Sequence, residues 1–240
     1  MEKNRLLYEG KAKRIYSTDQ ELVVRVEYKD SATAFNGEKK SEIAGKGVLN
    51  NEITSLIFAL LKSKGINSHF IQRLSEKEQL VQKVDIIPLE VVVRNVIAGS
   101  LSKRLGLEEG TGLKESIVEF YFKNDELGDP LVNEDHILTL EIASLPELDI
   151  LRAQALKINE ELNKLFQSIG VRLIDFKLEF GKDADGFIIL ADEISPDTCR
   201  LWDADTNTKL DKDVFRRDLG DLTKGYQEIL NRLRGAASHV

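Results

Sequence analysis

One segment limits the possible folds more than any other part of the chain, the stretch from 171 to 194. Along Val171–Phe180 charged and apolar residues alternate, which is the period of a β-strand with two different faces. Asp185-Gly186 follows, a dipeptide typical of tight hairpin turns because both residues accept a positive φ. A second apolar run, Phe187–Ile194, comes next. The segment predicts two antiparallel strands joined by a two-residue turn.

The expected turn also determines which residues face each other across the hairpin. With Asp185-Gly186 at its centre, Glu179 lies directly opposite Asp192, on the face that carries Asp175 and Lys177. Opposed carboxylates repel, so a sheet with only a structural role is not expected to pair them. We therefore expect a positive group between Glu179 and Asp192.

Magnesium is the cation that suits this pair of carboxylates. Mg²⁺ keeps several waters and takes one or two carboxylates together with the phosphate oxygens of a substrate. Lys177 on the same face adds the positive charge that a phosphate needs. A second interpretation is a solvated sheet face on which Lys177 pairs with Asp175 or Glu179. That interpretation accounts for the charges of the first strand but leaves the position of Asp192 unexplained.

The N-terminal segment Glu9–Lys13 supplies charge of the opposite sign. Lys11 and Lys13 lie two residues apart, so in a strand both ammonium groups point to the same side. Gly10 and Ala12 leave the backbone open to a close ligand. The pattern predicts a cover over a triphosphate. The alternative is a solvated basic edge strand that resists aggregation.

A further cluster favours a phosphate monoester. Glu90 and Arg94 share one strand face, and Arg94 leads into the small-residue turn Ala98-Gly99-Ser100. An arginine, a hydroxyl and free backbone amides together suit a phosphate group. Arg200 follows shortly after Asp192 and is expected to lie near the metal. A surface ion pair remains the alternative for each arginine.

The remaining chain mixes strands and helices without strict alternation, which is typical of an α+β fold with a mainly antiparallel sheet. Apolar residues recur at helical spacing over Val48–Lys64. Ser144 and Glu147 have the spacing of a capping box, and the helix that they begin is expected to end at Gly170. The tail Asp213–Leu233 is predicted to form one more amphipathic helix.

Strands are expected mostly in the first third of the chain. Lys29–Gly47 is polar and Leu105–Asn133 is rich in glycine, so both are predicted to be loops. Pro88 is expected to separate two strands, because proline cannot donate to a ladder. The predicted strands are Leu6–Tyr8, Lys11–Ser17, Leu22–Tyr28, Leu80–Val84 and Leu89–Val93.

Composition excludes several classes of protein. The 240 residues carry a formal net charge of −7, which argues against general nucleic-acid binding. The single cysteine, Cys199, rules out a disulfide framework and suits a reducing compartment. No apolar stretch approaches the ~20 residues that cross a bilayer, and the first residues are too charged for a signal peptide. We expect a cytoplasmic, soluble protein with neither a nucleic-acid nor a membrane partner.

Common catalytic motifs do not account for the chain. Gly45-Lys46-Gly47 lacks the upstream glycine and the Ser or Thr of a P-loop, and Gly110-Thr111-Gly112 does not complete G-x-G-x-x-G. No G-x-S-x-G motif and no H-R-D catalytic loop occur. The three histidines are scattered and match neither a metal site nor a catalytic triad.

Two longer segments resemble signatures of one family. Ile87–Arg94 with Ala98-Gly99-Ser100, and Leu173–Gly181, resemble signatures of the SAICAR synthetases of purine biosynthesis (phosphoribosylaminoimidazole-succinocarboxamide synthases). The resemblance spans essentially the whole chain. Three shorter segments also match the family: Tyr8–Lys13, Lys123-Asn124-Asp125 and Asp192–Asp197.

The resemblance implies a fold of two parts. Residues 1–84 are expected to form a small, kinase-like domain with an antiparallel sheet. Residues 85–240, including the C-terminal helices, are expected to form a larger ATP-grasp-like α+β domain. ATP is expected in the cleft between them, and the family resemblance also implies a homodimer.

The resemblance implies a ligase that uses ATP and Mg²⁺. The expected reaction joins the carboxylate of carboxyaminoimidazole ribonucleotide (CAIR) to the amine of L-aspartate through an acyl phosphate, and releases ADP and phosphate. Two other classes stay open. One is a different ATP-grasp ligase or a small-molecule kinase, and the other is a nucleotide sensor without catalysis.

The resemblance also implies a role for particular residues. Lys123, Lys177 and Asp175 are expected near the reacting groups, and Arg216 is our hypothesis for the aspartate. The residues implied at ATP and its metal are Lys11, Ala12, Lys13, Ile15, Gln82, Val84, Leu178, Glu179 and Asp192, of which Glu179 and Asp192 bind the metal. The residues implied at the ribonucleotide are Glu90, Arg94, Ser100, Asp175, Lys177, Asp197 and Arg200.

Overall fold

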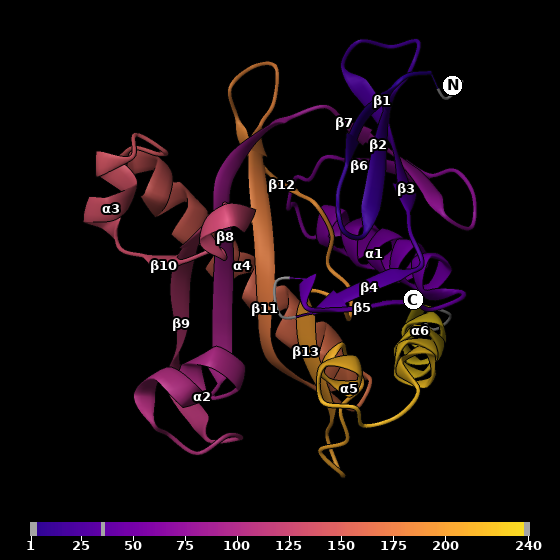
Figure 1. The fold of residues 1–240 in the computed structure, drawn as a ribbon, viewed down its shortest axis with the longest axis vertical. Coiled ribbons are helices and arrows are strands. Elements are labelled where there is room, and N and C mark those ends of the chain that lie inside the picture. The colour runs from indigo at the N-terminus through magenta and orange to yellow at the C-terminus, as the bar shows by residue number, and fades with distance from the viewer. Residues whose placement is uncertain (1–3, 35–36, 238–240) are drawn as a thin grey trace.

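The computed structural model describes residues 4–34 and 37–237 and shows a mixed α+β fold (Figure 1). A first sheet of five antiparallel strands has the order β1-β2-β3-β7-β6. These strands and the helix α1 within this part of the chain are β1 (Leu6–Glu9), β2 (Lys13–Ser17), β3 (Val23–Tyr28), α1 (Lys46–Ser63), β6 (Phe70–Arg73) and β7 (Glu78–Gln82).

A second, larger sheet has the order β10-β9-β8-β11-β12, with β13 also paired to β11. Every pairing between these strands is antiparallel. Its strands are β8 (Asp85–Val96), β9 (Gly112–Phe122), β10 (Leu131–Val132), β11 (Val171–Lys182), β12 (Ile188–Ala191) and β13 (Cys199–Asp203). The other helices are α2 (Gly99–Leu105), the 3₁₀ turn η2 (Asp125–Leu127), α3 (Glu134–Thr139), α4 (Leu145–Ser168), α5 (Asp213–Arg216) and α6 (Leu222–Ala237).

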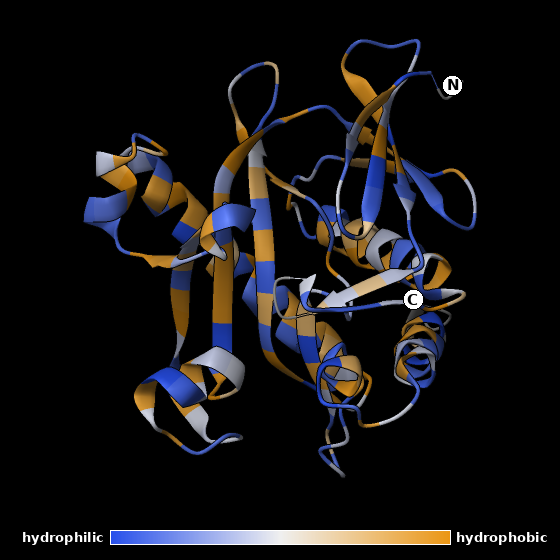
Figure 2. Cartoon of the chain, viewed as in Figure 1, coloured by the Kyte–Doolittle hydropathy of each residue, from blue (hydrophilic) through white to orange (hydrophobic). Residues whose placement is uncertain are grey.

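One continuous apolar core joins the large sheet to α1, α4 and α6. The apolar residues of α4 lie three or four positions apart, so they form one stripe that is buried against β8 and β11. Figure 2 shows bands of apolar and polar residues along β8 and β11, the pattern expected of strands with one face in the core. α1 therefore packs with the larger part of the molecule, although it precedes β8 in sequence.

Helix α4 confirms its predicted ends. The Glu147 carboxylate accepts hydrogen bonds from the backbone N–H and the hydroxyl of Ser144, at 2.7 and 2.8 Å. Gly170 follows the helix with φ 68°, the left-handed conformation that glycine adopts without a steric penalty. None of the helices in the two described ranges is long and apolar enough to cross a membrane.

The predicted loop over Lys29–Gly47 was wrong. The structure forms a hairpin there from β4 (Ser31–Ala34) and β5 (Lys39–Glu42). Ala32 and Ala34 are buried, but alanine carries too little hydrophobic signal for the alternation to stand out. Lys39 fastens the hairpin to α5 by donating to the Phe215 carbonyl at 2.6 Å and the Asp218 carboxylate at 2.5 Å.

The prediction of a loop over Leu105–Asn133 was also wrong, because β9 occupies eleven of these residues. The glycines of this segment lie before and after the strand, with Gly112 at its first position. Several of its side chains are charged and exposed, which hid the strand among polar residues.

Pro88 does not separate two strands but lies inside β8. The gap between β7 and β8 falls at Lys83 and Val84 instead. Pro88 coincides with a break in the register between β8 and β11, where Glu90 pairs with Glu179 and Ile86 with Gly181. A bulge is where a strand tolerates a residue that cannot donate.

The C-terminal tail forms two helices instead of the single predicted one. α5 ends at Arg216, and α6 begins at Leu222. Asp218 and Gly220 between them have φ values of 54° and 134°, which a helix cannot contain. Because of this break, α5 lies beside the cleft, which Arg216 lines, while α6 packs against α1.

Candidate active site

A cleft of about 870 Å³ lies between the two sheets and is lined by both. It contains the polar face predicted on β11, with Asp175, Lys177 and Glu179. The structure brings all of the predicted site residues except Leu178 to this cleft. Leu178 has no exposed surface and belongs to the core on the opposite face of β11. Phe176 is the apolar residue of β11 that lines the cleft.

The hairpin of β11 and β12 has a turn of three residues, which corrects the predicted register by one. Asp183 donates its N–H to the Phe187 carbonyl at 3.0 Å, and Gly186 has φ 84°. This is the loop type in which a left-handed glycine closes a three-residue turn. Glu179 consequently pairs with Ala191 and not with Asp192.

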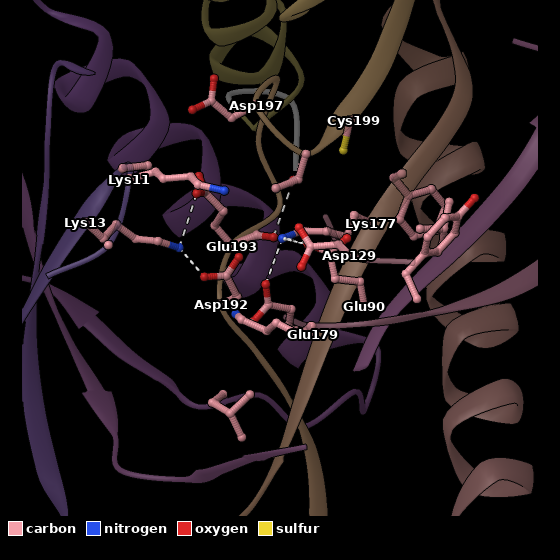
Figure 3. A pocket seen from close by; sticks show the side chains of 18 of the residues that line it. Lys11, Lys13, Glu90, Asp129, Lys177, Glu179, Asp192, Glu193, Asp197 and Cys199 are labelled. Carbon is pink, nitrogen blue, oxygen red and sulfur yellow. Dashed lines mark hydrogen bonds and ion pairs between the residues drawn. The ribbon is translucent and has the colours of Figure 1, made fainter. Parts of the chain in front are cut away.

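Asp192 reaches the cleft by a different route. It follows the last residue of β12 with φ 58°, a left-handed conformation that aspartate tolerates better than most residues. Asp192 and Glu179 both line the cleft, as Figure 3 shows. The two carboxylates therefore face the same space, although the register that predicted their meeting was wrong.

Lysines and carboxylates alternate in the centre of the cleft (Figure 3). The Lys177 ammonium lies 2.9 Å from a Glu90 oxygen and 2.7 Å from a Glu179 oxygen. Lys123 forms an ion pair with the second oxygen of Glu179. From the first sheet Lys13 pairs with Asp192. Each carboxylate in the cluster thus has a lysine beside it.

These neighbours keep the groups ionised despite their burial. Burial opposes the charged form of Asp192, but Lys13, Lys177 and Lys123 outweigh it and hold the pKa of this carboxyl well below its usual value. Burial also disfavours the charged form of Lys177, yet Glu179, Asp192 and Glu90 together raise its pKa well above the usual value. Asp192 and Lys177 are therefore both charged at neutral pH.

The donor set suits a magnesium ion that also binds phosphate. Glu179 and Asp192 supply only carboxylate oxygens, which are ligands that Mg²⁺ prefers. In the parts of the chain that the structure describes, no three His, Cys, Asp or Glu side chains form a closed metal cage. A site with two protein ligands leaves the other coordination positions for water and phosphate oxygens.

One end of the cleft is apolar and lies on the first sheet. Its wall includes Ile15, Val24 and Val81, and Gln82 and Val84 line it where β7 passes into β8. Lys11 extends from the loop before β2 and pairs with Asp125 of η2 at 2.7 Å. This pair and the pair of Lys13 with Asp192 connect the two sheets across the cleft.

The opposite end of the cleft is built around two arginines. Arg94 is 3% exposed and donates to Asp175 at 2.9 Å and to the Ser100 hydroxyl at 3.0 Å. Arg94 also donates to Glu119 and to the hydroxyl of Tyr121. These bonds fix the plane of the guanidinium and use most of its N–H groups.

Arg200 lies beside Arg94 and shares one of its partners. Its guanidinium donates to Asp175 at 2.9 Å and to Asp213 at 3.0 Å. Gly99 approaches it so closely that a Cβ at this position would lie 2.4 Å from the Arg200 Nη2 atom. Asp175 is therefore the anion that holds two guanidiniums side by side.

Asp197 faces the cleft with a side chain that is 4% exposed. The structure adds two partners that sequence reasoning missed, Lys46 of α1 and Tyr226 of α6. Lys46 belongs to Gly45-Lys46-Gly47, which does not complete a P-loop motif. Tyr226 lies in the predicted C-terminal amphipathic helix, where nothing in the pattern distinguishes it from a core residue. Glu193, next to Asp192 in sequence, also lines the cleft and lies 3.2 Å from Lys13.

Comparison with known proteins gives one consistent result. The SAICAR synthetase family model matches residues 6–233. A phosphoribosylaminoimidazole-succinocarboxamide synthase of Bacillus cereus (strain G9842) is 68% identical over 240 residues, which is 100% of both chains. The solved synthase of Ehrlichia chaffeensis has a TM-score of 0.94 at 50% identity and covers 96% of this chain and 98% of its own. A solved SAICAR synthetase in complex with ADP has a TM-score of 0.92 at 54% identity, with 95% and 97% covered.

Proposed function

Because the chain belongs to the SAICAR synthetase family and is a ligase of purine biosynthesis, we propose that its cleft joins CAIR to L-aspartate at the expense of ATP. The observation that carries this proposal is the order of groups along one cleft. Along β11, the cluster of lysines and carboxylates at Lys177 and Glu179 lies between the apolar wall, which reaches Gly181 through Val84, and the two arginines that pair with Asp175. They correspond to a nucleobase, a metal-bound triphosphate and the phosphate of a second substrate.

ATP is proposed to bind between the two sheets, with adenine against Ile15 and the backbone of Gln82 and Val84. The related SAICAR synthetase solved with ADP supports a nucleotide in this family. In this proposal the chain divides at residue 84 into a kinase-like first part and an ATP-grasp-like second part. The gap between β7 and β8 at Lys83 and Val84 agrees with that boundary.

Magnesium is proposed to bind to Glu179 and Asp192. Bound there, it would neutralise charge on the phosphates of ATP as the terminal phosphoryl group is transferred. Lys11 and Lys13 would then contact the phosphates from the first sheet, and Lys177 and Lys123 from the second. Each lysine that now pairs with a carboxylate would exchange that partner for a phosphate oxygen.

The chemical step begins with the carboxylate of CAIR. A carboxylate resists attack by an amine, because its charge repels the nucleophile and oxide is a poor leaving group. One carboxylate oxygen therefore attacks the γ-phosphorus of ATP, and ADP leaves. The aspartate nitrogen then attacks the carbonyl carbon of the acyl phosphate, loses a proton, and phosphate departs with the former carboxylate oxygen. Lys177 and Lys123 are proposed to spread the charge that develops on the transferred group.

Arg94, Ser100 and Arg200 are proposed to hold the ribose phosphate of CAIR, with Glu90 and Asp197 near the rest of the nucleotide. Asp175 orients both guanidiniums and is too occupied to act as a strong base, since it accepts from Arg94 and Arg200. Its effect on the reaction is therefore a matter of position.

Arg216 is proposed to bind a carboxylate of L-aspartate. It lines the cleft from α5, and one of its Nη atoms is held by Asp213 at 2.6 Å. Lys212 lines the same part of the cleft and supplies a second positive charge. Two cations suit an amino acid that brings two carboxylates.

The surroundings of the enzyme are proposed from its chemistry. A biosynthetic ligase that consumes ATP is expected in the cytoplasm, where the buried thiol of Cys199 would remain reduced. The proposed assembly is a homodimer, which sedimentation of the purified protein would establish.

The experiment that tests the function measures ADP release with each co-substrate omitted in turn. The ligase requires CAIR, L-aspartate and ATP together for amide formation. A small-molecule kinase would release ADP at full rate without aspartate. A nucleotide sensor would bind ATP and release no ADP under any combination.

Substitution of Glu179 by Gln separates the ligase from the sensor. The change removes one charged metal ligand, so kcat/KM is expected to fall at least about 100-fold, or about 2.7 kcal/mol of transition-state stabilisation. The Mg²⁺ concentration for half-maximal activity should rise. Glu160→Gln on the exposed face of α4 is the matched control and should leave both quantities unchanged. Undiminished activity in Glu179→Gln would contradict the metal assignment.

A further inference from the structure

Three buried polar side chains meet behind the ribonucleotide end of the cleft. The Tyr226 hydroxyl donates to the Asp197 Oδ1 atom at 2.5 Å. The Lys46 ammonium lies 2.6 Å from the Asp197 Oδ2 atom. Lys46 and Tyr226 have no exposed surface. The three residues come from the start of α1, the loop before β13 and the middle of α6.

Stability alone does not explain this cluster. Removing a lysine and a carboxylate from water costs several kcal/mol, and an apolar pair of similar volume stabilises a core at least as well. Tyr226 itself belongs to the apolar core that α1 and α6 share. A buried ion pair that packing does not require points to a role at the cleft that Asp197 lines.

The two partners divide the carboxylate of Asp197 between them. The Oδ1 atom accepts the hydrogen bond from Tyr226, and the buried Oδ2 atom is held by the ion pair with Lys46. The backbone N–H of Asp197 donates to Ser195 Oγ at 3.1 Å, which anchors the loop itself. With both oxygens anchored, the group cannot rotate, and its remaining acceptor positions keep a constant direction.

We propose that Tyr226 and Lys46 are positioning residues that hold Asp197 ionised and in one orientation, so that it accepts hydrogen bonds from the sugar hydroxyls of the ribonucleotide. The inference rests on the proposed function, because it assigns the ribonucleotide to this end of the cleft. Neither residue touches the substrate in this account. They act through Asp197 from two helices that are far apart in sequence.

Tyr226→Phe is the direct test, because it removes one hydroxyl and retains the ring in the core. The loss of one anchor is expected to raise KM for CAIR about tenfold, with kcat and the KM values for ATP and aspartate within twofold of the original enzyme. Tyr28→Phe is the matched control. Tyr28 is equally buried and accepts a hydrogen bond from Gln79 of β7 at 3.0 Å, away from Asp197. Its loss should lower stability without changing KM for CAIR.

Lys46→Met gives a second readout, which a structural role would not change. Without the ammonium, burial should raise the pKa of Asp197, so KM for CAIR in the variant should rise more steeply than in the original enzyme as the pH falls from 8 to 5. Lys212, 3.9 Å from Asp197, remains as the second cation and limits the effect. Three further charged or titratable groups surround the set of Asp197, Lys212 and Tyr226. They are Asp211, Arg216 and Glu193.

The outcomes separate the two proposals. If the unaltered enzyme forms no amide, the proposed function fails. If it is active but Tyr226→Phe has the same KM for CAIR, or Tyr226→Phe and Tyr28→Phe change it equally, the positioning role of Tyr226 is wrong. A KM for CAIR in Lys46→Met that rises no more steeply than in the original enzyme as the pH falls would overturn the role of Lys46.

Discussion

Gly99 begins α2 with φ 54° and leaves the space that Arg200 occupies. In Gly99→Ala the new methyl group would lie 2.4 Å from the Arg200 Nη2 atom, and Asp175 and Asp213 hold that guanidinium in place. The arginine must shift, so KM for CAIR is expected to rise about tenfold or more. KM for ATP should stay constant, since the wall proposed for adenine is at the other end of the cleft. Steady-state kinetics with each substrate varied separately checks this.

Gly106→Ala is the control for backbone strain. Gly106 ends the same helix with φ 65°, and a Cβ there would meet nothing within 4 Å. Both variants should lose about 1–2 kcal/mol of stability from the left-handed backbone. A rise in KM for CAIR in both would mean that strain, and not the contact with Arg200, is responsible.

Single residues of the cleft were predictable where they lie on strands. Alternation along β8 placed Glu90 and Arg94 on one face of that strand, and alternation along β11 did the same for Lys177 and Glu179. Alternation is a local property of a strand, so the sequence alone indicates it. Lys46 and Tyr226 were not predictable in this way. Each matters because it contacts Asp197, which lies about 150 residues after Lys46 and 29 residues before Tyr226. A local sequence pattern cannot indicate such a contact.

At the scale of elements, the start of α4 is a testable unit. In Glu147→Ala the helix loses the carboxylate that accepts from Ser144, and β11 loses the partner of Lys182 at 2.5 Å. The free energy of unfolding is expected to fall by about 1 kcal/mol, the usual value of a helix cap. Urea denaturation measures it. Glu160→Ala, in the exposed middle of α4, should change stability by less than about 0.5 kcal/mol. Equal losses would contradict a capping role.

Elements with a strong period were predicted well, and those with a weak one were not. α4 carries a long apolar stripe and two clear end signals, so its bounds followed from the sequence. The hairpin β4–β5 buries only small side chains, and β9 is mostly half-buried, with no alternation of buried and exposed residues. β9 is held by its neighbours β8 and β10, and the hairpin is held by the contacts of Lys39 with Phe215 and Asp218.

The β11–β12 turn shows how one residue alters a register. Asp185-Gly186 fits a two-residue turn and also the last two positions of a three-residue turn, and only Gly186 must be left-handed in the second case. The choice between them depends on packing along the whole hairpin. The predicted register was wrong by one residue, yet Asp192 faces the cleft as predicted. Its positive φ turns the side chain to the side that the two-residue turn would have given.

At the scale of the whole molecule, His69 is expected to make the fold sensitive to acid. It is 6% exposed beside Phe58 of α1, and burial lowers its pKa to about 3 from the usual 6.5. The unfolded chain therefore takes up a proton that the folded protein refuses. This contribution to stability is complete above pH 6.5 and falls by up to about 1.4 kcal/mol per pH unit as the pH drops toward 3.

His69→Gln tests this with a side chain that does not titrate. Asp211 acts in the opposite direction, because burial raises its pKa to about 7 and its contribution is lost as the pH rises through that value. The comparison is therefore between the two proteins at each pH. Urea denaturation at pH 6.5, 5.5 and 4.5 should show the variant gaining on the original protein as the pH falls. A constant difference between the two proteins over this range would exclude the explanation.

The ion pairs across the cleft affect which anions can bind there. Lys11 and Lys13 of the first sheet are already matched with Asp125 and Asp192 of the second. Pyrophosphate without a metal would pair with the lysines and leave the two carboxylates without a cation. A nucleotide that carries Mg²⁺ would supply phosphate oxygens to the lysines and a cation to the carboxylates. We therefore expect phosphates without a bound metal, such as pyrophosphate in the presence of a chelator, to inhibit the enzyme only weakly.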